Sequence, residues 1–120
     1  MQVGKIIELN LQFYTGIPYN HKMRTVIETP TFQKLAAKIW TDDERLEFID
    51  WISLNPLAGD VIPNADGARK VRWSITRKGK RGGVRIIYFN IAEDGTIFLI
   101  TLYQKSEQEN ISKKDIQKAV

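Results

Sequence analysis

The stretch that decides the fold is residues 29–56, TPTFQKLAAKIWTDDERLEFIDWISLNP. Thr29 followed by Pro30 is a typical helix start, because the hydroxyl can cap the first turn and proline suits the first helical position. Apolar residues then recur at helical spacing as far as Trp40 and form one face. The stretch therefore begins with an amphipathic helix.

A second helix follows almost immediately. Thr41 and Glu44 have the spacing of a capping box, in which each side chain bonds the other residue's backbone N–H. A broad apolar face extends to Ile52, and Pro56 ends the helix at Asn55, since a residue before proline disfavours helical backbone. We expect the two helices to form an αα-hairpin whose aromatic side chains fill the core.

Short runs rich in β-branched and aromatic residues flank the hairpin and predict strands. They cover residues 25–28, 68–74, 84–90 and 96–103, and a short polar helix capped by Ser112 follows. The segment 57–67 has the composition of a loop. The order β-α-α-β-β-β with a short C-terminal helix predicts an α+β domain, with an antiparallel sheet and the helices on one face.

The N-terminal segment differs from the rest of the chain. Apolar and polar residues alternate from Ile7 to Phe13, as in a half-buried strand. We divide the chain into an N-terminal extension, 1–22, which can add a strand, and a core domain, 23–120. Met23 could itself be a translation start, so both starts remain open.

The composition excludes several kinds of site. The chain has no Cys, which rules out disulfides, thiolate metal sites and cysteine nucleophiles. The sole His, His21, is expected at the surface, far from the basic stretch described next. No run approaches the roughly 20 apolar residues of a membrane helix, and the N-terminus lacks a signal-peptide pattern. We expect a cytoplasmic protein without a metal or other cofactor and without a membrane partner.

Positive charge is concentrated in one short stretch. Eight of the eighteen Lys and Arg residues lie between Arg69 and Arg85, and no Asp or Glu falls between Asp66 and Glu93. The net charge of +4 therefore divides into +8 for this stretch and −4 for the rest. A solvated basic face is the simplest interpretation, but the single sign and the density favour a nucleic-acid-binding surface.

Strand alternation divides the stretch into parts. Val71 and Trp73 should face the helices, which places Lys70 and Arg72 on the open side, with Arg85 on the next strand. We expect no carboxylate from these elements there. Such a face suits RNA cleavage by the 2′-oxygen, because Arg binds phosphate oxygens and cationic neighbours favour the neutral form of a Lys base.

Several motifs resemble bacterial toxins of the RelE superfamily, and among them the HigB-type branch. These motifs are the runs 55–62 (NPLAGDVI), 67–72 (GARKVR), 79–85 (GKRGGVR) and 102–107 (LYQKSE). The resemblance covers about residues 24–112. It implies a RelE-like fold and the toxin of a type II toxin–antitoxin system, a ribosome-dependent mRNA endonuclease (mRNA interferase) that blocks translation.

The resemblance also implies partners. They are a cognate antitoxin, expected to be a helix-turn-helix protein, and mRNA in the A site of the 30S ribosomal subunit. Operator DNA would be contacted only through the antitoxin.

The resemblance assigns roles to individual residues. The paired basic positions of the family match Lys70 and Arg72, its phosphate-binding arginine matches Arg85, and its last basic position matches Lys105, beside Tyr103. The loop residues Arg77, Lys78, Lys80 and Arg81 are expected to bind ribosomal RNA or antitoxin carboxylates.

The chain departs from the family pattern after Lys105. Ser106 stands where RelE has an arginine, and no tyrosine follows near Ser112. The group that protonates the leaving oxygen is therefore left open between Tyr103, Tyr88, Lys105 and a ribosomal group. Two other functions also stay open: a non-catalytic RNA- or ribosome-binding protein, and a degenerate toxin that acts only in an antitoxin complex.

Overall fold

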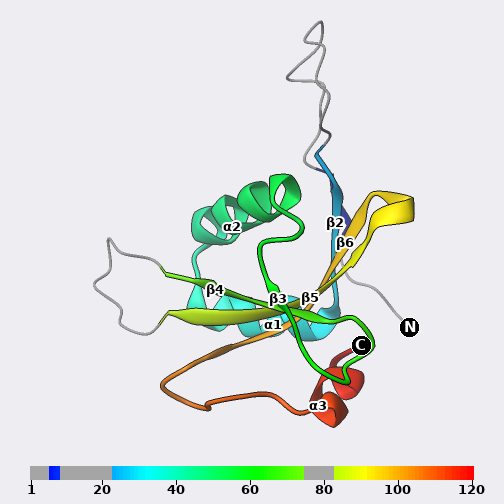
Figure 1. The fold of residues 1–120 in the computed structure, drawn as a ribbon. Helices are drawn as coiled ribbons and strands as arrows, with labels where there is room; N and C mark the ends of the chain where they lie inside the picture. The colour runs from blue at the N-terminus through cyan, green and yellow to red at the C-terminus, as the bar shows by residue number, and fades with distance from the viewer. Residues whose placement is uncertain (1–5, 9–22, 75–82) are drawn as a thin grey trace, which may run out of the picture.

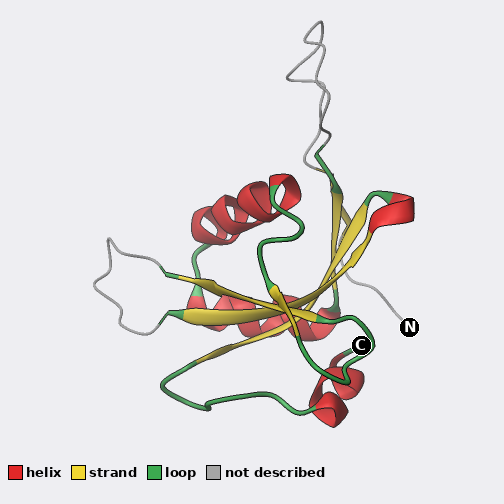
Figure 2. Cartoon of the chain, viewed as in Figure 1, coloured by secondary structure: helices red, strands yellow, loops and turns green. Residues whose placement is uncertain are grey.

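The computed structural model describes residues 6–8, 23–74 and 83–120. Its centre is a six-stranded sheet in the order β1-β2-β6-β5-β4-β3, drawn in Figures 1 and 2. The strands are β1 (Ile6–Glu8), β2 (Thr25–Glu28), β3 (Asp60–Val61), β4 (Arg69–Trp73), β5 (Val84–Ile91) and β6 (Thr96–Gln104). The helices are α1 (Pro30–Ile39), α2 (Asp42–Leu54) and α3 (Lys113–Ala119), with a 3-10 turn at Ala92–Asp94.

The α+β class and the order of the core elements are confirmed, and two details differ from the prediction. β2 runs parallel to β6, with Val26 opposite Ile97, so the sheet is mixed. The chain crosses over through α1 and α2 before it returns to the sheet, and a crossover of this length permits parallel pairing. α3 contacts the sheet on the face opposite α1 and α2, because its Ile116 and Ala119 pack in a separate cluster.

The sheet therefore has two apolar faces. The helix face carries the main core, built from Val26, Phe32, Ala36, Trp40, Phe48, Ile49, Ile52, Val71, Val84, Ile86, Tyr88, Ile97, Leu99 and Leu102. The other face, called the open face below, carries a smaller cluster of Ala65, Ala68, Ile87, Ile100, Tyr103, Ile116 and Ala119. α3 covers only one end of the open face, as Figure 1 shows.

Side-chain caps fix the helix starts as predicted. The Thr29 hydroxyl accepts a hydrogen bond from Phe32 N–H, and Thr41 and Glu44 form the expected capping box. The Ser112 hydroxyl accepts from Asp115 N–H at the start of α3. Each cap satisfies a backbone donor that would otherwise lack a partner in the first turn.

Two buried polar side chains on the helix face, Glu28 and Tyr88, have hydrogen-bond partners. Arg45 Nη1 of α2 lies 2.6 and 2.7 Å from the carboxylate oxygens of Glu28, which ends β2 and is fully buried. The Tyr88 hydroxyl accepts from Gly59 N–H and donates to the Pro56 carbonyl. These contacts connect α2 and the segment before β3 to the sheet.

The N-terminal segment is described only in part. Ile6–Glu8 pairs antiparallel with β2 and forms an edge of the sheet. The rest of the predicted alternation up to Phe13, together with His21, lies outside the described residues. In the described part of the chain, none of the helices combines the length and hydropathy of a membrane span.

Candidate functional site

The alternation in β4 separates its side chains as predicted. Val71 belongs to the core on the helix face, and Trp73 packs against it. Lys70 and Arg72 therefore project to the open face. Arg69 takes the other alternation, and its guanidinium donates to the Gly59 carbonyl at 2.6 Å, so it contributes to structure on the helix face.

Three predicted site residues form a row across neighbouring strands. Arg72 of β4 is directly opposite Arg85 of β5, and Arg85 is directly opposite Tyr103 of β6. Directly opposed residues have Cβ atoms about 5 Å apart, and like charges in that position are destabilising. An anion bound beside this pair would be attracted by both guanidinium groups.

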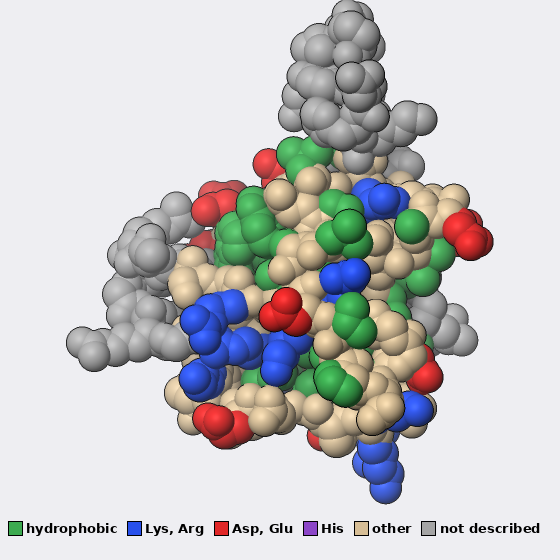
Figure 3. All heavy atoms as spheres, viewed as in Figure 1, with side chains coloured by type: hydrophobic (Ala, Val, Ile, Leu, Met, Phe, Trp, Pro, Cys, Tyr) green, Lys and Arg blue, Asp and Glu red, His purple; other side chains and the backbone are tan. Residues whose placement is uncertain are grey.

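The remaining predicted catalytic residues flank this row. Lys70 is opposite Ile87, one pair further along β4 and β5 on the same face. Lys105 follows the end of β6, and its N–H lies 3.5 Å from the Gly83 carbonyl. Figure 3 shows Lys and Arg side chains gathered where β4, β5 and the end of β6 meet.

Exposure divides these residues into two groups. Arg72 and Lys105 are exposed and Lys70 is half-buried, whereas Arg85 and Tyr103 keep only 7% and 5% of their surface. The prediction placed Arg85 on an open surface, and the structure buries it within the sheet. Its neighbours in the row, which the sequence pattern did not locate, account for the difference.

The Tyr103 hydroxyl is one of several buried polar atoms, Trp40 Nε1 and Asn90 Oδ1 among them, that lack a hydrogen-bond partner in the described part of the chain. Burial raises the pKa of Tyr103 above its ordinary value, the nearby Arg85 opposes this, and Glu109 adds to it. The hydroxyl therefore keeps its proton at neutral pH, and as a weak acid it can give this proton only to a strongly basic oxygen such as an alkoxide.

Tyr88, another candidate proton donor, is excluded by its surroundings. It lies on the helix face, fully buried, with its hydroxyl bonded to Pro56 and Gly59. Burial raises its pKa, and the hydrogen bond from Gly59 opposes this. Of the tyrosines considered as donors, only Tyr103 shares a face with the cations.

The strands 68–74 and 84–90 contribute no carboxylate to the open face, as expected, but the segment before them does. Segment 57–67 was predicted to be a loop, but Asp60–Val61 pairs with β4 as β3. This pairing sets Asp60 directly opposite Lys70 on the same face. The β-branched residues Val61 and Ile62 beside Asp60 were the available signal for a strand.

A second feature missed by sequence reasoning is the segment that follows β6. Residues 105–112, called the strap below, run from the end of β6 to α3 and cross the open face (Figure 1). Lys70 Nζ donates to Asn110 Oδ1 of the strap at 3.3 Å. Ile111 packs against the cluster that contains Tyr103. The strap therefore contacts Lys70 and the apolar cluster that contains Tyr103.

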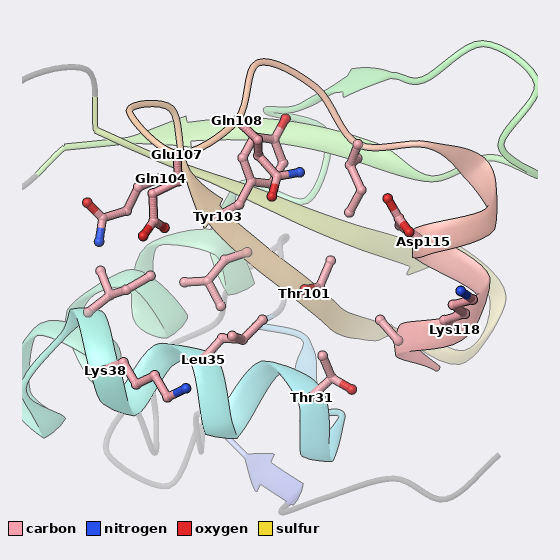
Figure 4. Close-up of a pocket in the computed structure, with 14 residues that line it drawn as sticks. Thr31, Leu35, Lys38, Thr101, Tyr103, Gln104, Glu107, Gln108, Asp115 and Lys118 are labelled. Atoms are coloured by element: carbon pink, nitrogen blue, oxygen red, sulfur yellow. The ribbon is translucent and has the colours of Figure 1, made fainter.

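The strap borders a groove of about 560 Å3. α1 forms the other wall of the groove with Leu35, Lys38 and Ile39, and the edge of β6 at residues 101–104 forms its floor. In Figure 4, Gln108 of the strap lies beside Tyr103 above β6, with α1 on the far side of the space. The groove leaves room between the strap and α1.

The predicted docking loop cannot be placed. Arg77, Lys78, Lys80 and Arg81 lie outside the described residues. Gly83, which follows them, has a φ of 62°, and a Cβ there would lie 2.6 Å from the Ser74 hydroxyl oxygen. Glycine is needed at this position for both reasons, so the two strand ends approach closely where the loop begins.

The sequence matches no protein-family model. The fold is similar to that of the Escherichia coli toxin RelE, solved in the free state as a double arginine-to-alanine mutant. The TM-score is 0.57 at 15% sequence identity, and the match covers 82% of this chain and 99% of the RelE chain. The chain therefore has a RelE-like fold.

Proposed function

We propose that this protein is the toxin of a type II toxin–antitoxin pair and that it cleaves mRNA on the ribosome without a metal ion. The observation that carries the proposal is the row of Arg72, Arg85 and Tyr103 across three neighbouring strands. The RelE-like fold supports it, and so does the sequence resemblance to the HigB-type branch.

The row supplies the groups that cleavage by the 2′-oxygen requires. Lys70, one pair away from Arg72 on the same face, is the proposed base for the 2′-hydroxyl proton. Arg72 and Arg85 hold the phosphate and stabilise the negative charge of the phosphorane. Tyr103 gives its proton to the departing 5′-oxygen. Lys105 lies beside the row and adds a positive charge near the leaving oxygen.

Each bond change in this sequence has a named group. The 2′-oxygen forms a bond to phosphorus while the bond to the 5′-oxygen breaks, which leaves a 2′,3′-cyclic phosphate and a 5′-hydroxyl. Lys70 gives one proton to solvent before the reaction and, as the neutral amine, then takes the 2′-hydroxyl proton, while the Tyr103 proton passes to the 5′-oxygen. The proposed partners are the 30S A site, mRNA and an antitoxin that holds the protein inactive.

The test is to map mRNA ends in ribosomes after induction of the chain. We expect new ends within A-site codons that carry 2′,3′-cyclic phosphate, together with growth arrest. The double substitution Lys70→Ala with Arg85→Ala should lower cleavage by at least about 100-fold, the usual cost of losing a charge-stabilising group. Unfolding in urea checks that the variant remains folded.

A matched control removes two cations outside the site. Lys34 of α1 and Lys114 of α3 are exposed, and Lys34→Ala with Lys114→Ala should leave cleavage unchanged. If a folded Lys70→Ala, Arg85→Ala variant still cleaves at the original rate, the assignment of the site is wrong.

A second function is favoured by one observation. Arg85 and Tyr103 are almost entirely buried, which suits a protein that binds RNA through exposed cations without cleaving it. Such a protein would bind RNA with a strong salt dependence and arrest growth, but stalled ribosomes would contain no cyclic phosphate ends.

A further inference from the structure

The predicted site has a cover. Tyr103 keeps 5% of its surface, yet the reaction described above needs its hydroxyl at the leaving oxygen. Ile111 of the strap packs against the cluster that contains Tyr103, and Gln108 and Tyr103 line the same groove (Figure 4). Glu109 is near enough to raise the pKa of Tyr103. The hydroxyl is buried with the strap in this position.

The strap is an exposed segment that is held in place by few contacts. Residues 105–110 are all exposed, and its first turn rests on hydrogen bonds from Glu107 N–H and Gln108 N–H to the Gln104 carbonyl. The Gln108 side chain bonds the Asn110 carbonyl within the strap itself. A segment with few buried apolar contacts and exposed hydrogen bonds opens at low free-energy cost.

One hydrogen bond links the strap to a proposed catalytic group. Lys70 Nζ donates to Asn110 Oδ1 across the open face. Lys70 also belongs to the cationic group that would receive an RNA phosphate. A phosphate oxygen is charged and therefore a stronger acceptor for an ammonium group than a neutral amide. A bound phosphate would thus compete with Asn110 for Lys70.

The groove gives the strap somewhere to move. About 560 Å3 lies between the strap and α1, bordered by Glu107, Gln108 and Ile111 on the strap side. Tyr103 itself lines this groove, so a movement of the strap along the groove changes how far Tyr103 is exposed. Lids that close or open over a site in this way commonly control access to it.

We propose that the strap is a lid over Tyr103 and that RNA phosphate opens it by taking Lys70 from Asn110. Asn110 is then a positioning residue that holds the lid closed in the free protein. Opening on substrate would restrict proton donation by Tyr103 to the RNA-bound state. This inference rests on the proposed function in that the competing anion is an RNA phosphate.

The experiment is hydroxyl-radical footprinting of the full chain, read by tandem mass spectrometry. Tyr88 and Tyr103 fall in one tryptic peptide, residues 86–105, so Tyr88 is an internal reference that stays buried. The ligand is a single-stranded 2′-O-methyl oligoribonucleotide, which carries the phosphates but cannot be cleaved by 2′-oxygen attack. Binding is followed separately by fluorescence anisotropy.

We expect Tyr103 to be protected in the free protein and to be oxidised several-fold faster in Asn110→Ala and in Lys70→Ala. Bound oligonucleotide should raise Tyr103 oxidation in the unmodified chain and leave Tyr88 unchanged. The control is Gln117→Ala, which removes an exposed amide of α3 and should match the unmodified chain. Asn110 is itself exposed, so its substitution should not disturb folding.

If Tyr103 stays protected in both Asn110→Ala and Lys70→Ala, the Lys70–Asn110 hydrogen bond does not hold the strap closed. This conclusion holds whether or not the oligonucleotide exposes Tyr103. A parallel rise at Tyr88 also overturns it, because it shows general unfolding rather than movement of a lid. Cleavage plays no part in this measurement. If the strap opens but mRNA stays intact, the proposed function is wrong and the lid is supported. If mRNA is cleaved while Tyr103 stays protected, the lid is wrong and the proposed function is supported.

Discussion

Tyr88 and Tyr103 lie on neighbouring strands, β5 and β6, and face opposite sides of the same sheet. Both are buried, with 0% and 5% of their surface exposed, and burial raises the pKa of both. The Tyr88 hydroxyl has a donor and an acceptor, at Gly59 and Pro56, whereas the Tyr103 hydroxyl has no partner among the described residues.

The two faces also differ in how their charged side chains are arranged. The helix face pairs its buried charge, Glu28 with Arg45, while the open face sets Arg72 directly opposite Arg85. Unsatisfied polar groups and opposed like charges lower stability. On the open face, the Tyr103 hydroxyl, which has no described hydrogen-bond partner, lies in the same row as the two opposed arginines, and such an arrangement suits a ligand-binding face.

The comparison is tested most strongly by the ion pair of the helix face. Arg45→Ala would leave the fully buried Glu28 carboxylate without its guanidinium partner. We expect the free energy of unfolding to fall by about 3–5 kcal/mol, as for other buried pairs broken on one side. Urea unfolding measures the change.

Two controls separate charge from packing in that result. Lys34→Ala removes an exposed cation of α1 and should change stability by less than about 0.5 kcal/mol. Replacing both partners, Glu28→Met with Arg45→Met, should restore much of the loss, because no unpaired charge remains buried. If Arg45→Ala is as stable as Lys34→Ala, the ion pair between Glu28 and Arg45 does not stabilise the helix face.

The two tyrosines should respond differently to loss of the hydroxyl. Tyr88→Phe leaves the buried Gly59 N–H without an acceptor and should lower the free energy of unfolding by about 1–3 kcal/mol. Tyr103→Phe removes a hydroxyl that has no partner, so stability should stay the same or rise. Equal destabilisation of the two variants would show that Tyr103 has a structural partner.

The exposed cations of the open face should affect binding and leave stability unchanged. Arg72→Gln and Lys105→Gln each remove a charge from an exposed side chain. We expect each to weaken binding of single-stranded RNA and to lower the salt slope by about 0.7 per lost phosphate contact. Anisotropy titrations at several salt concentrations measure the slope. An unchanged slope in both variants would mean that RNA does not bind this face.

Local signals in the sequence were enough to predict the helices and the central strands. The caps at Thr29, Thr41 and Ser112 are short-range chemistry and fix the helix starts. Alternation in β4 likewise gave the faces of Lys70 and Arg72. These features depend on residues a few positions apart, so the sequence pattern contains them.

Long-range pairing accounts for what the sequence did not reveal. Asp60 reaches Lys70 only because a two-residue strand joins the sheet, and Asn110 reaches Lys70 from forty residues away. The burial of Arg85 depends on its neighbours across two strand pairs. Periodicity cannot reveal such contacts, and they determine whether the cations are open to a ligand.

The smallest expected effect is a pH dependence that both tyrosines share. In the unfolded chain a tyrosine has its ordinary pKa of about 10, and in the folded chain burial raises the pKa of Tyr88 and Tyr103. The folded state therefore keeps these protons at a pH where the unfolded chain loses them. Their contribution to stability is complete below about pH 10 and falls as the pH rises further.

Phenylalanine variants isolate this contribution from that of the lysines. The loss of stability in urea between about pH 9 and pH 11 should be smaller in Tyr103→Phe and in Tyr88→Phe than in the unmodified chain. If the strap opens readily, Tyr103 is often exposed to solvent. Tyr103 should then contribute less than Tyr88 to the loss of stability at high pH. A larger share for Tyr103 than for Tyr88 would mean that the open face excludes water as firmly as the helix face, and the difference between the two faces would then reside in hydrogen bonding alone.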